Sequence, residues 1–305
     1  MKRSPKPNCA SRADGDADAP ANRHIDPLSR DMTTYEHPEQ TIGVDPLAHS
    51  GFGRGAAAYE RGRPAYPEPA IRWLAQRLAI KAGSTVLDIG AGTGKLTRQT
   101  QRLTGASMVA VEPVGAMRAQ LRAAGPETVV LDGQAEALPL ADASVDAALC
   151  GEAFHWFDGP AALAEIHRVL RAEASLGLLW NVHVWDRSAA WVRAIEALIA
   201  PYSDGRAATR YTSGHWFGAF RTTELFGPLE QASFTHVQRL DCEQLVAHVA
   251  SVAFIAALPQ ETRDPILAQV PRVFEIDPVL STTGEASIRY RTDAYATRSR
   301  PITFH

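Results

Sequence analysis

The stretch from Asp88 to Gly94 holds the residue types best suited to chemistry in this chain. It reads Asp-Ile-Gly-Ala-Gly-Thr-Gly, so a glycine stands at every second position from Gly90 onward. Glycine adopts backbone conformations that other residues avoid, and it lets a ligand approach the main chain closely. A turn of this kind directly before a helix presents backbone N–H groups to a ligand. The candidate cofactor contacts of this turn are Asp88, Gly90, Ala91, Gly92, Thr93 and Gly94.

The spacing of the glycines argues against a phosphate-binding P-loop. Such a loop needs a longer spacer before its Gly-Lys pair, followed by Ser or Thr to hold magnesium. Here Gly90 lies one residue too close to Gly94-Lys95, and Leu96 stands where the hydroxyl residue belongs. The P-loop interpretation therefore fails.

A dinucleotide site is the next class to weigh. Its fingerprint is Gly-x-Gly-x-x-Gly, whereas this turn has the single spacers Ala91 and Thr93. The carboxylate of Asp88 would repel a pyrophosphate but attract an ammonium group. The chain also has no Tyr-x-x-x-Lys pair for hydride chemistry. The turn thus favours S-adenosylmethionine, and an NAD-type oxidoreductase and a non-catalytic cofactor-binding protein remain the alternatives.

A second acidic residue stands where a ribose would lie. Glu112 follows the apolar run Ser107 to Val111, at the expected carboxyl end of a strand. Ligands of open α/β sheets bind at that edge, so Glu112 is placed to accept the two ribose hydroxyls. NAD enzymes also use an acid there, so Glu112 does not separate the two cofactors by itself.

Short apolar runs alternate with amphipathic stretches around these residues, which is typical of βαβ units with a parallel sheet. A loop at 61–67 leads into a helix near 71–78. The predicted strands are 85–89, 107–111, 128–131, 145–150 and 175–180, and the predicted helices between them are 95–104, 116–124 and 160–170. The fold class is α/β, with a Rossmann-like, doubly wound, mostly parallel sheet.

The two ends of the chain differ from this middle part. Residues 1–50 are predicted to be a disordered tail, because they contain almost no large apolar clusters. One domain is expected over 51–305, with the core sheet at about 85–181. A helical cover and the last strands are expected at 182–298. Helices are predicted at 191–199, 244–258 and 267–274, and strands at 232–240 and 285–296. The helices are expected to form a cover rather than a second core.

Composition excludes several classes of protein. The chain has 305 residues, 45% of them hydrophobic, and a net charge of −3, which does not suggest a nucleic-acid or membrane partner. Its three cysteines, Cys9, Cys150 and Cys242, have neither disulfide-framework nor zinc spacing. No metal site is expected, and a cytoplasmic location is predicted.

The motifs occur in the order found in a known family. Val86 to Gly94 resembles motif I of the class I S-adenosylmethionine-dependent methyltransferases, and Val109 to Pro113 resembles the segment that closes on the ribose. Gly133 to Leu140 is similar to the family's third-strand signature, and Gly151 to Asp158 to its fourth-strand exit. The type-11 group is the closest in pattern, particularly bacterial members with an "AFHWF" exit. Their segment Tyr-x-Arg-x-Arg-Pro-x-Tyr-Pro is matched from Tyr59 to Pro67.

The resemblance implies a seven-stranded class I methyltransferase sheet and S-adenosylmethionine as cofactor. It also implies cofactor contacts beyond the glycine turn. These are Glu112, Pro113, Gln134, Ala135, Glu136 and Glu152. Gln134 replaces a frequent Asp, so the backbone of Ala135 is the alternative contact for the adenine.

The sequence predicts the residues that bind the methyl acceptor less closely than those that bind the cofactor. His155 follows the fourth strand and is the candidate catalytic residue, as a base or as a wall of the acceptor pocket. Enzymes that methylate DNA bases carry a Pro-Pro-aromatic segment there, where this chain has Gly151 to Phe154. A small-molecule acceptor is therefore predicted.

Overall fold

Seven strands form one sheet in the computed structural model, which describes residues 55–203 and 211–301. The predicted tail, residues 1–50, lies outside the described residues. The strands are β1 (Thr85–Ile89), β2 (Ser107–Val111), β3 (Val129–Leu131), β4 (Val145–Gly151), β5 (Leu170–Val184), β6 (Glu230–Leu240) and β7 (Ala286–Arg298).

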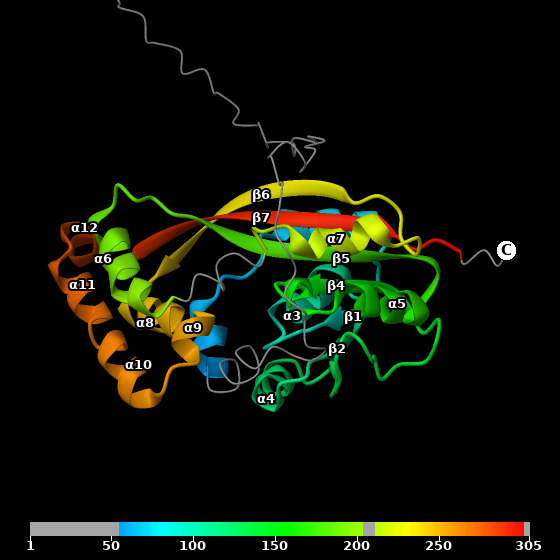
Figure 1. Cartoon of the computed structure of the whole chain (residues 1–305), viewed down its shortest axis with the longest axis horizontal. Helices are drawn as coiled ribbons and strands as arrows, with labels where there is room; N and C mark the ends of the chain where they lie inside the picture. The colour runs from blue at the N-terminus through cyan, green and yellow to red at the C-terminus, as the bar shows by residue number, and fades with distance from the viewer. Residues whose placement is uncertain (1–54, 204–210, 302–305) are drawn as a thin grey trace, which may run out of the picture.

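The strand order is β3-β2-β1-β4-β5-β7-β6 (Figure 1). The pairs from β3 through β5 are parallel, whereas β7 runs antiparallel to both β5 and β6. The strands β2 and β3 lie on one side of β1, and β4 lies on its other side. After β3 the chain therefore crosses over, and the direction in which strands are added reverses. Ligands bind outside the carboxyl ends of the strands at such a switch point. The predicted doubly wound, mostly parallel sheet is confirmed.

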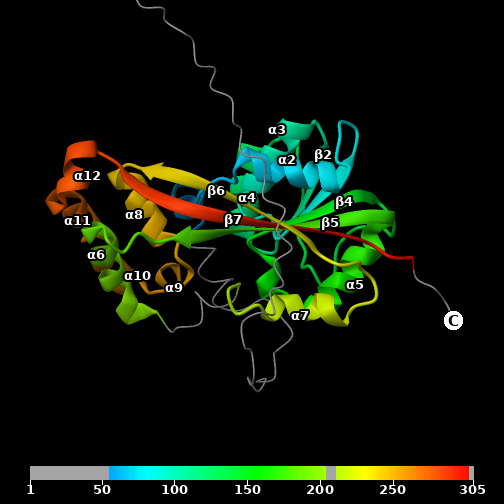
Figure 2. The ribbon, with the colours of Figure 1, turned by 90° about the horizontal axis from the view of Figure 1, so that it is seen from above.

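Helices cover both faces of the parallel half of the sheet. The helices α2 (Glu68–Arg77) and α3 (Lys95–Thr104) lie on one face, and α5 (Gly159–Val169) and α7 (His215–Thr222) on the other (Figure 2). Because the central strands are covered on both sides, Val86, Leu87 and Ile89 of β1 are fully buried. This explains why adjacent residues of β1, such as Val86 and Leu87, are both apolar instead of alternating with polar ones.

The remaining helices are α4 after β2 and a group in the C-terminal half of the chain. Residues 55–62 are also helical. The bounds are α4 (Gly115–Ala124), α6 (Ala190–Ile199), α8 (Cys242–Ala250), α9 (Ala253–Ala256), α10 (Gln260–Leu267), α11 (Val270–Ile276) and α12 (Pro278–Thr283), with 3-10 turns at Phe154–Trp156 and Ala200–Tyr202.

Two helix predictions in this half are wrong. The predicted helix 244–258 is broken, because Ser251 donates its hydroxyl to the carbonyl of His248 and Val252 takes an extended conformation. The predicted helix 267–274 spans a break as well, since α10 ends at Leu267 and α11 starts at Val270 with a proline in its first turn. The apolar pattern continues through both breaks, so periodicity did not reveal them.

The prediction that the C-terminal helices only cover the sheet is also wrong. The helices α6, α8 and α11 pack on the far ends of β6 and β7, beyond the parallel strands (Figure 1). They bury a hydrophobic cluster of their own, which includes Trp191, Leu245 and Phe274. The long strands β5 and β7 connect this second core to the parallel half of the sheet.

Candidate functional site

The glycine turn forms one wall of the site at the carboxyl end of β1. Gly90, Gly92 and Gly94 all have positive φ angles, between 58° and 83°, which glycine adopts without strain. A Cβ atom on Gly90 would lie 2.7 Å from the Cβ of Ala153, whereas one on Gly92 would meet nothing within 4 Å. The turn is therefore in close contact with Ala153 at Gly90, and it has open space beside it at Gly92.

Glu112 joins this turn to the end of β2. Its Oε2 accepts the backbone N–H of Gly92 at 2.9 Å, and its Oε1 accepts that of Val114 at 2.8 Å. Burial raises the pKa of the Glu112 carboxyl, and the two N–H donors act against that rise. Each carboxylate oxygen has a further lone pair. The carboxylate is thus held rigidly and can still accept hydroxyl protons.

A mostly apolar cavity opens beside Glu112 and is called the Glu112 cavity below. Its apolar walls come from Val114, Met117, Ala153, Trp156 and Phe157. The sequence-predicted residues Pro113, Gln134, Ala135 and Glu136 line it as well. Flat apolar walls with an acid at one end suit a nucleoside.

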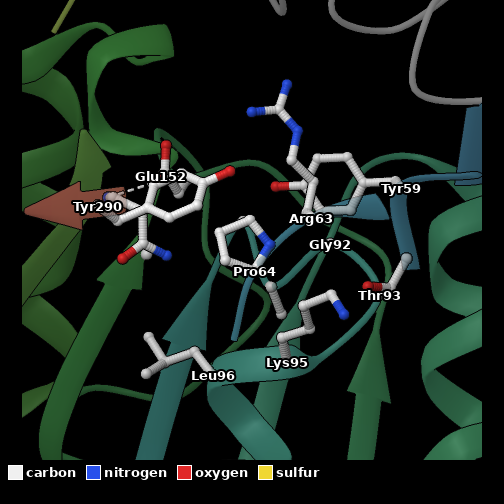
Figure 3. Close-up of a pocket in the computed structure, with 13 residues that line it drawn as sticks. Tyr59, Arg63, Pro64, Gly92, Thr93, Lys95, Leu96, Glu152 and Tyr290 are labelled. Atoms are coloured by element: carbon white, nitrogen blue, oxygen red, sulfur yellow. Dashed lines mark hydrogen bonds between the residues drawn. The ribbon is translucent and has the colours of Figure 1, made fainter. Parts of the chain in front are cut away.

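A second cavity, called the Arg63 cavity, continues from the first. The two share Tyr59, Gly90, Gly92, Gly151 and Glu152. Ala91 and Thr93 of the turn line only the Arg63 cavity, and its further walls are Arg63, Pro64, Lys95, Leu96, Asn181 and Tyr290 (Figure 3). The side chains of Tyr59 and Tyr290 point toward one another across it (Figure 3).

Glu152 stands at the junction of the two cavities. Its φ of 57° is positive, a strained conformation for a residue with a side chain, and such strain gathers at functional sites. Its Oε1 accepts the backbone N–H of Asn181. Burial raises the pKa of the Glu152 carboxyl to about 7, against the opposing effects of that N–H and of the Arg63 charge. Glu152 therefore changes charge near neutral pH.

Three predicted site residues line neither cavity. Asp88 is buried behind the turn, where its Oδ2 accepts the Thr97 hydroxyl at 2.5 Å and its Oδ1 has no partner. Burial raises the pKa of Asp88 to about 7. Gly94 is the N-cap of α3, and a Cβ atom there would lie 2.7 Å from Cγ of Leu121. His155 accepts the indole N–H of Trp180 on Nδ1 at 2.9 Å. Direct contacts of these three with cofactor or acceptor stay predictions.

The segment 55–66, called the strap below, lines the Arg63 cavity with Tyr59, Arg63 and Pro64 and is attached to two other parts of the fold. Glu60 pairs with Arg98 at 2.6 Å and with Lys95 at 3.7 Å, which ties the strap to α3. On the other side Gly62 packs so tightly on α8 that a Cβ would lie 2.3 Å from the nitrogen of His248. The strap therefore bridges the parallel half of the sheet and the C-terminal helices.

A polar network lies behind the wall that Tyr290 forms. The Gly62 carbonyl can only accept, so Nδ1 of His248 and Nε2 of Gln238 both donate to it, at 3.0 and 3.1 Å. The Nε2 of His248 must then accept from Nε2 of His183 at 3.3 Å. The Tyr290 hydroxyl donates to Gln238 at 3.2 Å and lies 3.1 Å from Nε2 of His183.

Both histidines of this network are neutral near pH 7. Burial lowers the pKa of His248 to about 4 and that of His183 well below its usual value. Neutral rings keep the donor and acceptor assignment given above. The network therefore holds Tyr290 in place and fastens the strap without adding a charge.

Sequence reasoning missed Arg63, Lys95, Asn181 and Tyr290 as cavity residues. The sequence motif that starts at Tyr59 includes Arg63, so this motif could have identified Arg63 as a site residue. Tyr290 is separated from the glycine turn by almost the whole domain, and no local pattern connects the two. Within the described ranges no three His, Cys, Asp or Glu side chains gather as a metal site would require. No described helix is both long and apolar enough to cross a membrane.

Comparison with known proteins adds to this geometry. Residues 87–178 match a family model described as a methyltransferase domain. An uncharacterized methyltransferase of Mycobacterium tuberculosis is 38% identical over 242 residues, which cover 79% of this chain and 92% of the relative. An uncharacterized methyltransferase of Schizosaccharomyces pombe is 32% identical over 251 residues, covering 82% of this chain and 98% of the relative.

Two further similarities are more distant. A malonyl-[acyl-carrier protein] O-methyltransferase of Pectobacterium atrosepticum is 34% identical over 165 residues, or 53% of this chain and 62% of that protein. The structure of a putative type II methyltransferase from Anaeromyxobacter dehalogenans superposes with a TM-score of 0.55 at 24% identity, covering 78% of this chain and 97% of that one. The latter match supports the fold.

Proposed function

This chain belongs to the class I S-adenosylmethionine-dependent methyltransferases, and we propose that it methylates a small-molecule acceptor bound in the Arg63 cavity. Membership of the family decides against the NAD-type oxidoreductase that the sequence left open. The observation that carries the proposal is the pair of continuous cavities at the switch point of the sheet. One is apolar with an acid at its edge, and the other is polar and charged.

The residues of the Glu112 cavity fit the adenosine part of S-adenosylmethionine. Glu112 has free lone pairs for ribose hydroxyls, and Val114, Met117 and Phe157 offer apolar surface to a base. The missing side chain of Gly92 leaves open space where the turn meets both cavities. The cofactor supplies an electrophilic methyl group when bound, and these residues bind and orient it.

The Arg63 cavity would take the methionine tail and the acceptor. Its walls include the hydrogen-bonding side chains of Tyr59, Arg63, Asn181 and Tyr290. Tyr59 and Arg63 of the strap line it and Tyr59 is half-buried, which favours an acceptor of small size. The absence of a basic patch in the composition also favours a small molecule over a nucleic acid.

The proposal is tested first by ligand binding. Isothermal titration of the protein with S-adenosylhomocysteine, S-adenosylmethionine and NAD should give heat with the first two and none with NAD. A labelled-methyl screen of small acids, phenols and amines then tests the acceptor class. Methyl transfer to tRNA or DNA with none to any small molecule would contradict the proposal.

A further inference from the structure

Among the residues that the structure describes, Arg63 is the cation of the site without a partner of opposite charge. Two cations line the Arg63 cavity, and Lys95 is paired with Glu60 at 3.7 Å. No described carboxylate lies within ion-pair distance of Arg63, whose only hydrogen bond runs from Nη2 to the Ser251 carbonyl at 3.0 Å. Its Nε is buried and has no partner at all.

An unpaired guanidinium beside a cavity needs explanation, because a charge removed from water is stabilised only by a counter-charge and hydrogen bonds. The ring of Tyr59 lies 5.5 Å from the guanidinium carbon and offers only a cation–π contact. The guanidinium has a planar fork of donors that matches the two oxygens of a carboxylate. The arrangement therefore fits an anion that arrives with a ligand.

The position of Arg63 points to the acceptor rather than to the cofactor. In Figure 3 its guanidinium lies on the far side of the Tyr59 ring from Lys95, which begins α3. The Arg63 charge shifts the pKa of His183, His248 and Tyr290 on the side of the C-terminal helices. It also lowers the pKa of Glu152 and Tyr59, which line both cavities. It is absent from the causes that shift the pKa of Asp88 and Glu112 beside the glycine turn.

The charge balance of the cavity favours a single negative charge on the ligand. Arg63 contributes one positive charge that forms no ion pair with a described residue, and Glu152, whose pKa the Arg63 charge lowers, shares the cavity. A phosphate monoester carries about −1.5 to −2 charges near neutral pH, whereas one carboxylate carries a single charge. A carboxylate would neutralise Arg63 without an excess of negative charge next to Glu152.

We propose that the methyl acceptor carries a carboxylate that pairs with the guanidinium of Arg63. The proposal rests on the proposed function, since it names the chemistry of the acceptor in the same cavity. It concerns recognition, in which Arg63 binds and orients the acid while the cofactor donates the methyl group. Arg63 is then a specificity-determining residue of the reaction.

The first arm of the test asks whether Arg63 instead binds the carboxylate of the cofactor. Arg63→Gln and the control Arg61→Gln, an exposed arginine of the same strap, are titrated with S-adenosylhomocysteine and 5′-methylthioadenosine. The second ligand lacks the amino-acid tail. We expect the affinity of Arg63→Gln for S-adenosylhomocysteine to stay within about twofold of wild type, because a lost charged pair costs tenfold or more. A tenfold loss for S-adenosylhomocysteine alone would overturn the proposal.

The second arm uses protein saturated with S-adenosylhomocysteine and a panel of small mono-, di- and tricarboxylic acids, each with its primary amide. At least one acid should bind wild type and Arg61→Gln at least about tenfold more tightly than its amide, and Arg63→Gln should lose this preference. Arg63→Lys should keep part of it, because it retains the charge but not the fork. A panel in which no acid binds better than its amide, or a phosphate monoester that binds better than every acid, overturns the proposal.

Folding and function are controlled separately. The thermal unfolding of Arg63→Gln is compared with that of wild type. If Arg63→Gln does not fold, Arg63→Lys is used for the binding measurements instead. Wild-type protein that binds neither S-adenosylmethionine nor S-adenosylhomocysteine would contradict the proposed function itself. Normal cofactor binding without a preference for acids would contradict only the role of Arg63.

Discussion

The Oε2 atom of Glu112 accepts the backbone N–H of Gly92 across two adjacent strands, at 2.9 Å. This one bond joins two of the sequence signals that pointed to a nucleoside cofactor, the glycine turn after β1 and the acid after β2. Because β1 and β2 pair in parallel register, with Ile89 opposite Val111, the residues that follow each strand arrive at the same edge of the sheet.

Replacing Glu112 should weaken cofactor binding. In Glu112→Gln the amide nitrogen must face either the Gly92 or the Val114 N–H, so a donor opposes a donor and the turn loses one restraint. We expect the affinity for S-adenosylhomocysteine to fall by about tenfold to a hundredfold, as for a loss of roughly 1–3 kcal/mol. Titration calorimetry measures this. The matched control is Asp132→Asn, an acid near the same edge that lines neither cavity and should bind normally. Equal affinity of Glu112→Gln and wild type would remove Glu112 from the site.

The buried carboxyl of Glu152 should make folding stability depend on pH. Its pKa is about 7 in the folded protein, against 4.5 as its ordinary value. Between these values the folded protein keeps the proton that the unfolded chain has released, so stability falls as the pH rises and the loss is complete above pH 7. Glu152→Gln removes this dependence.

The measurement is urea unfolding at several pH values from 5 to 8. The free energy of unfolding of wild type minus that of Glu152→Gln should decrease across this range. For the exposed control Glu127→Gln, the free energy of unfolding should change with pH in the same way as that of wild type. Asp88 is present in all three proteins, so its own titration cancels in the difference. A constant difference between wild type and Glu152→Gln would show that the Glu152 carboxyl is not buried in this way.

The contact between the strap and α8 should not tolerate a side chain at position 62. A Cβ on Gly62 would lie 2.3 Å from the backbone nitrogen of His248, and backbone cannot rotate aside. We expect Gly62→Ala to destabilise the protein by about 1–3 kcal/mol, as overpacking does. Gly218→Ala is the control, because a Cβ there meets nothing within 4 Å and alanine favours the helix α7. Thermal unfolding of the two variants should separate them. Similar melting temperatures would mean that the strap is not seated on α8.

His155 should contribute to stability through Trp180. Its Nδ1 accepts the buried indole N–H, so His155→Ala leaves that donor without a partner and should cost about 1–3 kcal/mol. Trp180→Phe in the His155→Ala background removes the donor as well, and the double-mutant cycle gives the coupling. Because His155 lines neither cavity, the affinity for S-adenosylhomocysteine should be unchanged. A large loss of that affinity in His155→Ala would place His155 at the cofactor instead.

Local sequence determined the strands and the turn that surround the Glu112 cavity. The bounds of β1, α3 and β2 agree with the predicted ranges residue for residue, because buried parallel strands are uniformly apolar and the glycines end β1 at one definite point. Glu112, Gln134 and Glu152 of the Glu112 cavity come at or shortly after the ends of β2, β3 and β4, so knowing the strands was enough to bring them to one edge.

The tertiary structure alone decided which residues meet at the Arg63 cavity. Tyr290 reaches the cavity because β7 inserts antiparallel between β5 and β6, and Arg63 reaches it because the strap is fastened to both α3 and α8. The break at Ser251 depends on a side-chain hydroxyl that competes for a helix carbonyl. That Lys95 has a counter-charge and Arg63 has none follows from distances between segments far apart in the chain. A local sequence pattern indicates which residues are buried, but only the folded chain determines which charged side chains form ion pairs.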